Sequence, residues 1–278
     1  MKHKKTNGEN ADLKLVKKFH QFIKVEMGPV NTAIIDLLTG NVFQVPNEVI
    51  NQFDAGNYDD VNEFIKVAYE EFLIIDISPS RWIPVPPPQA KEDNTKKRDK
   101  SIELHIDEGI PVKKIMDAFK GFSISKIYYY SEEIPEDLNN LQALERKEKN
   151  FEKCRQQANV DGNFYKTHSS MVKFNMQYNS CWGSSIAITA DGKIRPCIHS
   201  QIEVGDIETD LEDIDALFEK MEPFWRYNKD RVQRCSVCEF RYVCFDCREI
   251  AFRKTGDMDG TNPLCNYNPY TGEWEEEA

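Results

Sequence analysis

The sequence predicts an α/β protein made of three domains and a linker. Short β-rich runs alternate with amphipathic helical segments up to about residue 178, and a proline-rich, polar stretch interrupts them. Of the eight cysteines, none precedes Cys154 and seven lie between Cys181 and Cys265. We therefore expect a small hairpin-plus-helices domain over 12–83, a linker over 84–100, a truncated, partly barrel-like βαβα region over 101–178, and a cysteine-rich domain over 179–278.

The N-terminal domain is predicted to contain a hairpin followed by helices. Apolar residues recur at helical spacing over 11–27, which predicts a first helix. Two β-rich runs flank Gly40, a residue suited to the positive φ of a hairpin turn. The predicted elements are a helix over 11–27, strands over 32–37 and 41–45, helices over 47–53 and 58–72, and a strand over 73–77.

The middle region is predicted to alternate strand and helix, as parallel βαβ units do. The predicted elements are a strand over 102–106, a helix over 111–119, a strand over 125–130, a long charged helix over 135–157, and a less clear strand over 171–176. So few strands cannot close an eight-stranded barrel, which takes about 200 residues or more.

Composition narrows the class of function. The formal net charge of −11 argues against a nucleic-acid partner, because no excess of Lys and Arg is present to neutralise phosphates. No apolar run approaches the roughly 18 residues that a membrane-spanning helix needs, and the polar start shows no signal peptide. We expect a cytoplasmic protein, in which thiols stay reduced and clustered cysteines bind metal.

A hairpin is predicted to bring two of the cysteines together. Cys181 precedes an alternating β-rich run, Asp191 and Gly192 supply the turn, and the return run leads to Cys197. Because the ends of a hairpin lie side by side, the two sulfurs can converge on one metal site.

The remaining cysteines form two close pairs and a distant last member. Five residues separate Cys238 from Cys244, whereas zinc modules usually separate their pairs by about 12 to 20 residues. Tight spacing of many thiolates favours iron–sulfur clusters, and zinc stays open because thiolate ligands suit both. The pairs and the last cysteine are Cys235 with Cys238, Cys244 with Cys247, and Cys265.

At this point the pattern resembles the SPASM domain, the twin-cluster extension of radical-SAM peptide-modifying enzymes. The family order is a Cys, a Gly five residues before a second Cys, a C-x-x-C pair, and three further Cys. The matching residues here are Cys181, Gly192, Cys197, Cys235, Cys238, Cys244, Cys247 and Cys265. The resemblance implies two [4Fe-4S] clusters, one on Cys235, Cys238, Cys244 and Cys265, and the other on Cys181, Cys197 and Cys247.

The match departs from the family at two points. Two residues separate Cys244 from Cys247 where the family commonly has three. The second cluster also lacks an evident fourth cysteine, and the alternatives are Cys154, His199 or an open iron.

The stretches 238–248 (CEFRYVCFDCR) and 263–274 (PLCNYNPYTGEW) closely resemble the grasp-with-SPASM peptide maturases. This resemblance implies a precursor peptide and an ATP-grasp ligase, or another maturation enzyme, as partners. The order of elements over 12–83 is similar to that of leader-peptide-binding modules, so we expect this domain to bind the precursor.

One absence in the sequence shapes the functional prediction. S-adenosylmethionine cleavage requires a cluster on a C-x-x-x-C-x-x-C loop, and this chain has no such loop. We therefore expect no S-adenosylmethionine cofactor here. Three interpretations remain: an accessory protein carrying clusters, a peptide-modifying enzyme that uses an open auxiliary cluster, and a zinc-stabilised adaptor.

Overall fold

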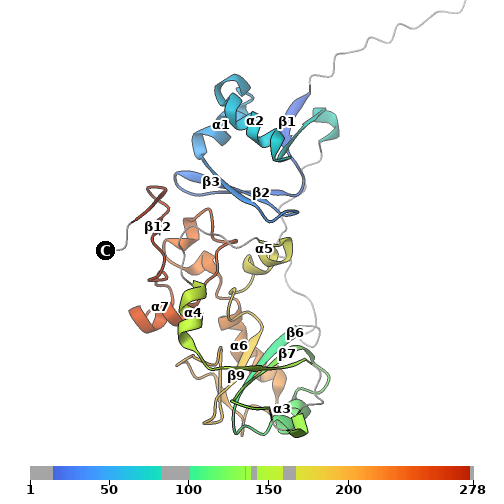
Figure 1. Cartoon of the computed structure of the whole chain (residues 1–278), viewed down its shortest axis with the longest axis vertical. Coiled ribbons are helices and arrows are strands. Elements are labelled where there is room, and N and C mark those ends of the chain that lie inside the picture. The colour runs from blue at the N-terminus through green and yellow to red at the C-terminus, as the bar shows by residue number, and fades with distance from the viewer. Residues whose placement is uncertain (1–14, 83–100, 135, 139–142, 159–166, 276–278) are drawn as a thin grey trace, which may run out of the picture.

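The computed structural model describes residues 15–82, 101–134, 136–138, 143–158 and 167–275. The predicted linker over 84–100 lies outside these residues. Figure 1 shows the N-terminal unit at one end of an elongated molecule, a larger sheet at the other, and the C-terminal segments between them.

The N-terminal unit contains the predicted hairpin, helices and closing strand. A three-stranded antiparallel sheet packs against two helices, and a separate antiparallel pair joins the first and last strands of the unit. The elements are β1 (Val16–Phe19), β2 (Ile23–Met27), β3 (Asn31–Asp36), β4 (Val42–Pro46), α1 (Asn47–Ala55), η1 (Tyr58–Val61), α2 (Asn62–Glu70), β5 (Ile74–Ile77) and η2 (Pro79–Arg81).

The predicted helix over 11–27 is wrong in its described part, which forms β1 and β2. A turn around Phe22 separates the two strands, and the amide N–H of Ile23 donates to the carbonyl of His20. Val16 lies opposite Ile77 in the β1–β5 pair. The apolar residues of β1 are therefore spaced for pairing with the distant strand β5 and not for one face of a helix.

Strand β3 is buried on both of its faces. Ile34 packs with the helices, whereas Ala33 and Ile35 point the other way and pack against Phe240 and Val243 of the C-terminal region. Successive strand residues point to opposite faces, so one strand serves two cores. The N-terminal sheet thus lies between its own helices and the cysteine-rich region (Figure 1).

The middle and C-terminal regions share one mixed six-stranded sheet. Its order is β11-β10-β9-β6-β7-β8; β8, β7, β6 and β9 pair in parallel, and β10 pairs antiparallel with both β9 and β11. The strands are β6 (Ser101–Asp107), β7 (Ser123–Tyr130), β8 (Leu144–Lys147), β9 (Ser185–Ile188), β10 (Lys193–Arg195) and β11 (Gly205–Asp206).

This sheet confirms two predictions and bears on a third. The helix α3 (Val112–Ala118) connects the parallel strands β6 and β7, as the βαβ pattern predicted. The hairpin of β9 and β10 turns at Gly192, whose φ is +78°. The predicted boundary between residues 178 and 179 stays a prediction, and the sheet extends across it.

Two further predicted elements are wrong. The long helix over 135–157 is instead η4 (Glu136–Leu138), the edge strand β8 and the shorter helix α4 (Phe151–Ala158), with 135 and 139–142 outside the described residues. The strand over 171–176 is instead the helix α5 (Ser169–Asn175), whose first turn is capped by the His168 side chain. Strand β8 forms because it pairs in parallel with β7, which overrides its helix-forming composition.

The two faces of the large sheet differ in what covers them. Helices α3 and α6 (Ile214–Trp225) pack on one face over the core that includes Leu104 and Ile188. The other face presents Tyr128, Tyr130 and Ala187, with Ile198 packed beside them. The remaining elements are η5 (Lys229–Arg231), η6 (Cys235–Val237), α7 (Arg248–Thr255), β12 (Tyr267–Asn268) and β13 (Glu273–Trp274). Within the described ranges, no helix is both long and apolar enough to cross a membrane.

Candidate metal centres

Four cysteines line one small cavity under the N-terminal sheet. Apart from two cationic side chains, the other walls of this cavity are aromatic. The four are Cys235, Cys238, Cys244 and Cys265, hereafter the Cys235 group. The structure therefore brings together the residues that the resemblance assigned to one cluster.

A lysine shares this cavity with the four thiols. Lys229 is only 7% exposed, and its side chain interacts with the sulfur of Cys244. Burial alone would lower the pKa of Lys229, but the negative charges of Cys244, Cys235 and Asp246 raise it above its ordinary value. The lysine therefore holds a positive charge against the group.

Three thiols of the Cys235 group are hard to ionise even with Lys229 beside them. Burial raises the pKa of Cys235 to about 11, despite the opposing charge of Lys229. Burial also raises the pKa of Cys238 and of Cys244. Metal binding would replace these protons, and it would supply the positive charge that the buried sulfurs lack.

A second set of cysteines lies toward the tyrosine face of the six-stranded sheet. Cys181 and Cys247 share a side-chain hydrogen bond, which raises the pKa of Cys181 and lowers that of Cys247 because one proton lies between them. Burial and the charge of Cys247 raise the pKa of Cys197 to about 12. The hairpin of β9 and β10 thus brings Cys197 to the side of Cys181 and Cys247.

Cys154 belongs to this second set. Burial, followed by the charge of Cys247, raises the pKa of Cys154, and Cys154 in turn acts on Cys181. Burial raises the pKa of Tyr130, and the negative charges of Cys154, Cys197 and Cys181 raise it further, so all three thiols lie near this hydroxyl. We call Cys154, Cys181, Cys197 and Cys247 the Cys181 group.

The His199 side chain lies near this group but faces other residues. Its ring centroid is 5.4 Å from that of Phe151. Burial and the charges of Lys149 and Arg253 lower its pKa, while Asp107 opposes them. Of the two candidates for a fourth ligand, Cys154 is the one whose side chain interacts with the other thiols.

The loop between the two groups is fixed by a buried ion pair. Arg248 is fully buried, and its Nε and Nη2 donate to the two carboxylate oxygens of Asp246 at 2.7 and 2.6 Å. Its Nη1 donates to the carbonyls of Met258 and Gly260, and Asn179 Nδ2 donates to Asp246 at 3.0 Å. Asp246 lies between Cys244 and Cys247, so the pair holds one cysteine of each group.

The donor sets fit a thiolate-bound metal group. Each set offers four thiols, the ligand set of a [4Fe-4S] cluster and also of structural zinc. Beside the Cys181 group, the buried Nε1 of Trp182 interacts with the sulfur of Cys197 and lowers the pKa of that thiol. As placed in the described ranges, no three His, Cys, Asp or Glu side chains are grouped closely enough for a single ion.

Sequence reasoning missed Lys229 and Asp246. Lys229 lies in a polar stretch with no motif, and only the fold shows that it is buried against sulfurs. Arg248, which follows Cys247 in the sequence, is fully buried. Arg241 pairs with Glu26 of strand β2 and so contacts the N-terminal unit.

Comparison with known proteins gives a distant and partial similarity. No family model matches the chain. An AdoMet-dependent heme synthase from Nitratidesulfovibrio vulgaris is 29% identical over 84 residues, covering 30% of this chain and 22% of the relative. One from Methanosarcina barkeri is 28% identical over 125 residues, covering 43% of this chain and 34% of the relative. The chain is therefore distantly related, over part of its length, to a family of radical SAM enzymes.

Proposed function

We propose that this chain holds two [4Fe-4S] clusters and acts in the maturation of a ribosomally synthesised peptide. It binds the precursor, a partner modifying enzyme such as an ATP-grasp ligase, or both. The observation that carries the proposal is the gathering of all eight cysteines into two groups of four. The similarity to radical SAM enzymes, which carry iron–sulfur clusters, supports the metal assignment.

Cys235, Cys238, Cys244 and Cys265 would hold one cluster, and Cys181, Cys197, Cys247 and Cys154 the other. Bound clusters supply electron transfer, or Lewis acidity where an iron is open. With Cys154 as fourth ligand neither group leaves an iron open, which favours an accessory role over catalysis on an auxiliary cluster. Lys229 offsets thiolate charge in the Cys235 group, and the Arg248–Asp246 pair positions the cysteines of both groups.

The N-terminal unit is proposed to receive the precursor peptide. Strands β2 and β4 each pair only with β3 in the described residues, so each presents one backbone edge to which an extended peptide could add. The proposal is supported by the order of hairpin and helices, and by the contact of this unit with the Cys235 group.

Metal analysis after anaerobic iron–sulfur reconstitution tests the clusters. We expect about eight iron atoms per chain, a broad absorbance near 400 nm, and about half that iron in Cys265→Ala. Ser236→Ala, a neighbour within the first C-x-x-C pair, is the control and should keep all the iron. Loss of all or none of the iron in Cys265→Ala contradicts the ligand division, and zinc in place of iron supports the adaptor.

The comparisons favour a second candidate function. Both curated relatives are AdoMet-dependent heme synthases, so this chain could serve a tetrapyrrole reaction instead of peptide maturation. Binding assays with the full chain separate the two. Affinity for the small protein encoded beside its gene supports the first, whereas affinity for a porphyrin and not for that protein supports the second.

A further inference from the structure

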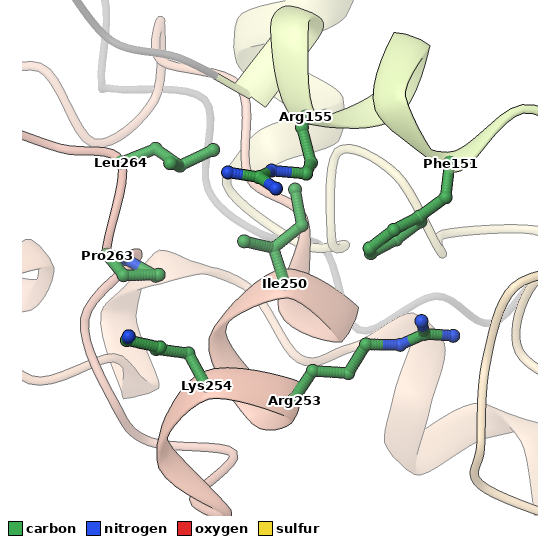
Figure 2. A pocket seen from close by; sticks show the side chains of 7 residues that line it. All are labelled: Phe151, Arg155, Ile250, Arg253, Lys254, Pro263 and Leu264. Carbon is green, nitrogen blue, oxygen red and sulfur yellow. The ribbon is translucent and has the colours of Figure 1, made fainter.

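A cavity of about 390 Å³ opens beside the Cys181 group, between helices α4 and α7 (Figure 2). Its apolar walls come from Phe151, Ile250, Pro263 and Leu264, and its three charged residues are all cations: Arg155, Arg253 and Lys254. No carboxylate is among the described residues that line it. This is a basic site on a chain whose net charge is −11.

The three cations differ in how far their charge is already neutralised. Arg253 Nε lies 2.6 Å from the buried carboxylate of Glu249, and its guanidinium lies 4.3 Å from the centre of the Phe151 ring. Arg155 makes only a 3.7 Å pair with Glu152, and the two side chains are 52% and 61% exposed. Such exposed pairs contribute little, about 0 to 1 kcal/mol. Lys254 has no ion pair in the described part of the chain.

The arrangement of these side chains suits a ligand with both acidic and apolar parts. Figure 2 shows Arg155 and Lys254 on either side of Ile250, with Pro263 and Leu264 beside them. Arg253 extends away from them toward Phe151. The two available cations therefore flank an apolar surface, where a carboxylate and a neighbouring apolar side chain can both be accommodated.

The apolar wall of the cavity is also a wall of the Cys181 group. Ile250 packs with Cys247 and Ala158, and Cys181 and Leu264 pack against the same cluster of side chains. A ligand in the cavity would thus lie against residues that contact the sulfurs.

We propose that this cavity binds an acidic segment of a peptide, with carboxylates on Arg155 and Lys254 and apolar side chains on Ile250 and Leu264, and holds it beside the Cys181 group. The proposal rests on the proposed function in peptide maturation and adds to it a binding site and a charge preference. Charge complementarity selects the occupant, because the lining offers cations and apolar carbon and no described acceptor group for a basic peptide.

Fluorescence anisotropy with the full, reconstituted chain tests the site. The probe is a labelled peptide of alternating leucine and glutamate, and its partner replaces every glutamate by glutamine. We expect the acidic peptide to bind at least about tenfold more tightly, and Arg155→Gln with Lys254→Gln to remove most of that preference. Lys153→Gln is the matched control, because Lys153 lies on α4 but pairs with Glu148 and does not line the cavity.

Each result decides the question. Equal binding of the two peptides, or an unchanged preference in the double variant, overturns the proposal. Tighter binding of a porphyrin carboxylate at the same two residues assigns the cavity to a small molecule and overturns the peptide. Iron is measured in the same samples: full iron without acidic preference rejects only this inference, whereas acidic preference without iron rejects the cluster assignment.

Discussion

Replacement of Arg248 by methionine should strongly destabilise the chain, because it leaves the buried carboxylate of Asp246 without the guanidinium that pairs with it. Arg248 makes two hydrogen bonds to Asp246 and one each to the carbonyls of Met258 and Gly260, and both charged side chains are at most 2% exposed. Breaking a buried pair by removing one partner costs about 3 to 5 kcal/mol. Methionine has a similar length, so the loss comes from the unpaired Asp246 and the two unsatisfied carbonyls rather than from a cavity.

Urea unfolding under anaerobic conditions, followed by circular dichroism, measures this loss. The control is Arg81→Met, since Arg81 is exposed and should change the free energy of unfolding by less than about 0.5 kcal/mol. Asp246→Asn alone should also destabilise the chain. The double variant should lose less than the sum of the two single losses, because neither charge is then left alone.

The reasoning would be refuted by a loss below about 1 kcal/mol in Arg248→Met with an unchanged dependence on urea. Additive losses in the double variant would also refute it, since they would show that the two side chains act independently.

Two further predictions concern single titratable side chains. Lys229→Met should lower the reduction potential of one cluster by an amount on the order of 100 mV, because a positive charge beside the sulfurs favours the added electron. Lys229→Arg keeps the charge and should keep the potential. A redox titration that gives Lys229→Met the same potentials as the unaltered chain would contradict the proposed role of Lys229. Burial, with smaller contributions from Lys147 and His199, lowers the pKa of His105 to about 3. Folded His105 stays neutral, whereas the same residue in the unfolded chain takes up a proton below about pH 6.5. The free energy of unfolding is therefore unaffected by His105 above pH 6.5, and it falls by up to about 1.4 kcal/mol per pH unit as the pH decreases toward 3. Urea titrations at pH 7 and pH 5 should show that His105→Gln removes about 2 kcal/mol of this pH dependence, and equal pH dependence would contradict the assignment.

Elements that depend on local signals were predicted well from the sequence. Gly192 supplies the left-handed residue of the β9–β10 turn, with the Thr189 hydroxyl bonded to Asp191 beside it. The turn at Gly40 is equally local. These residues determine the backbone conformation of their immediate neighbours, so the turns can be predicted from the sequence without knowledge of the fold.

Elements that depend on distant partners were not predicted. The apolar spacing over 11–27 is compatible with a helix, but β1 pairs with β5 some 60 residues later. The helix-forming residues of β8 form an edge strand because Leu144 lies opposite Ile127 in parallel pairing. In both cases a tertiary contact outweighs a local preference.

The same distinction applies to the candidate centres. Spacing paired Cys235 with Cys238, which do share one group, but it also paired Cys244 with Cys247, which the fold divides between the two groups. Cys154 had no such neighbour, and only the path of the chain from β8 into α4 brings it to Cys247. Lys229 was missed for the same reason, since nothing in its neighbourhood in the sequence indicates burial.

Strand β3 affects how easily oxygen could reach the two cysteine groups. Ala33 and Ile35 belong to the buried core that contains Cys244, and Cys238 and Cys265 pack against that core. A strand some 200 residues earlier in the chain therefore shields these sulfurs from oxygen. The Cys181 group is covered differently, because Ala158 of α4 and Ile250 of α7 pack with Cys247. Loss of the N-terminal sheet would thus expose the sulfurs of one centre and leave the covering of the other in place.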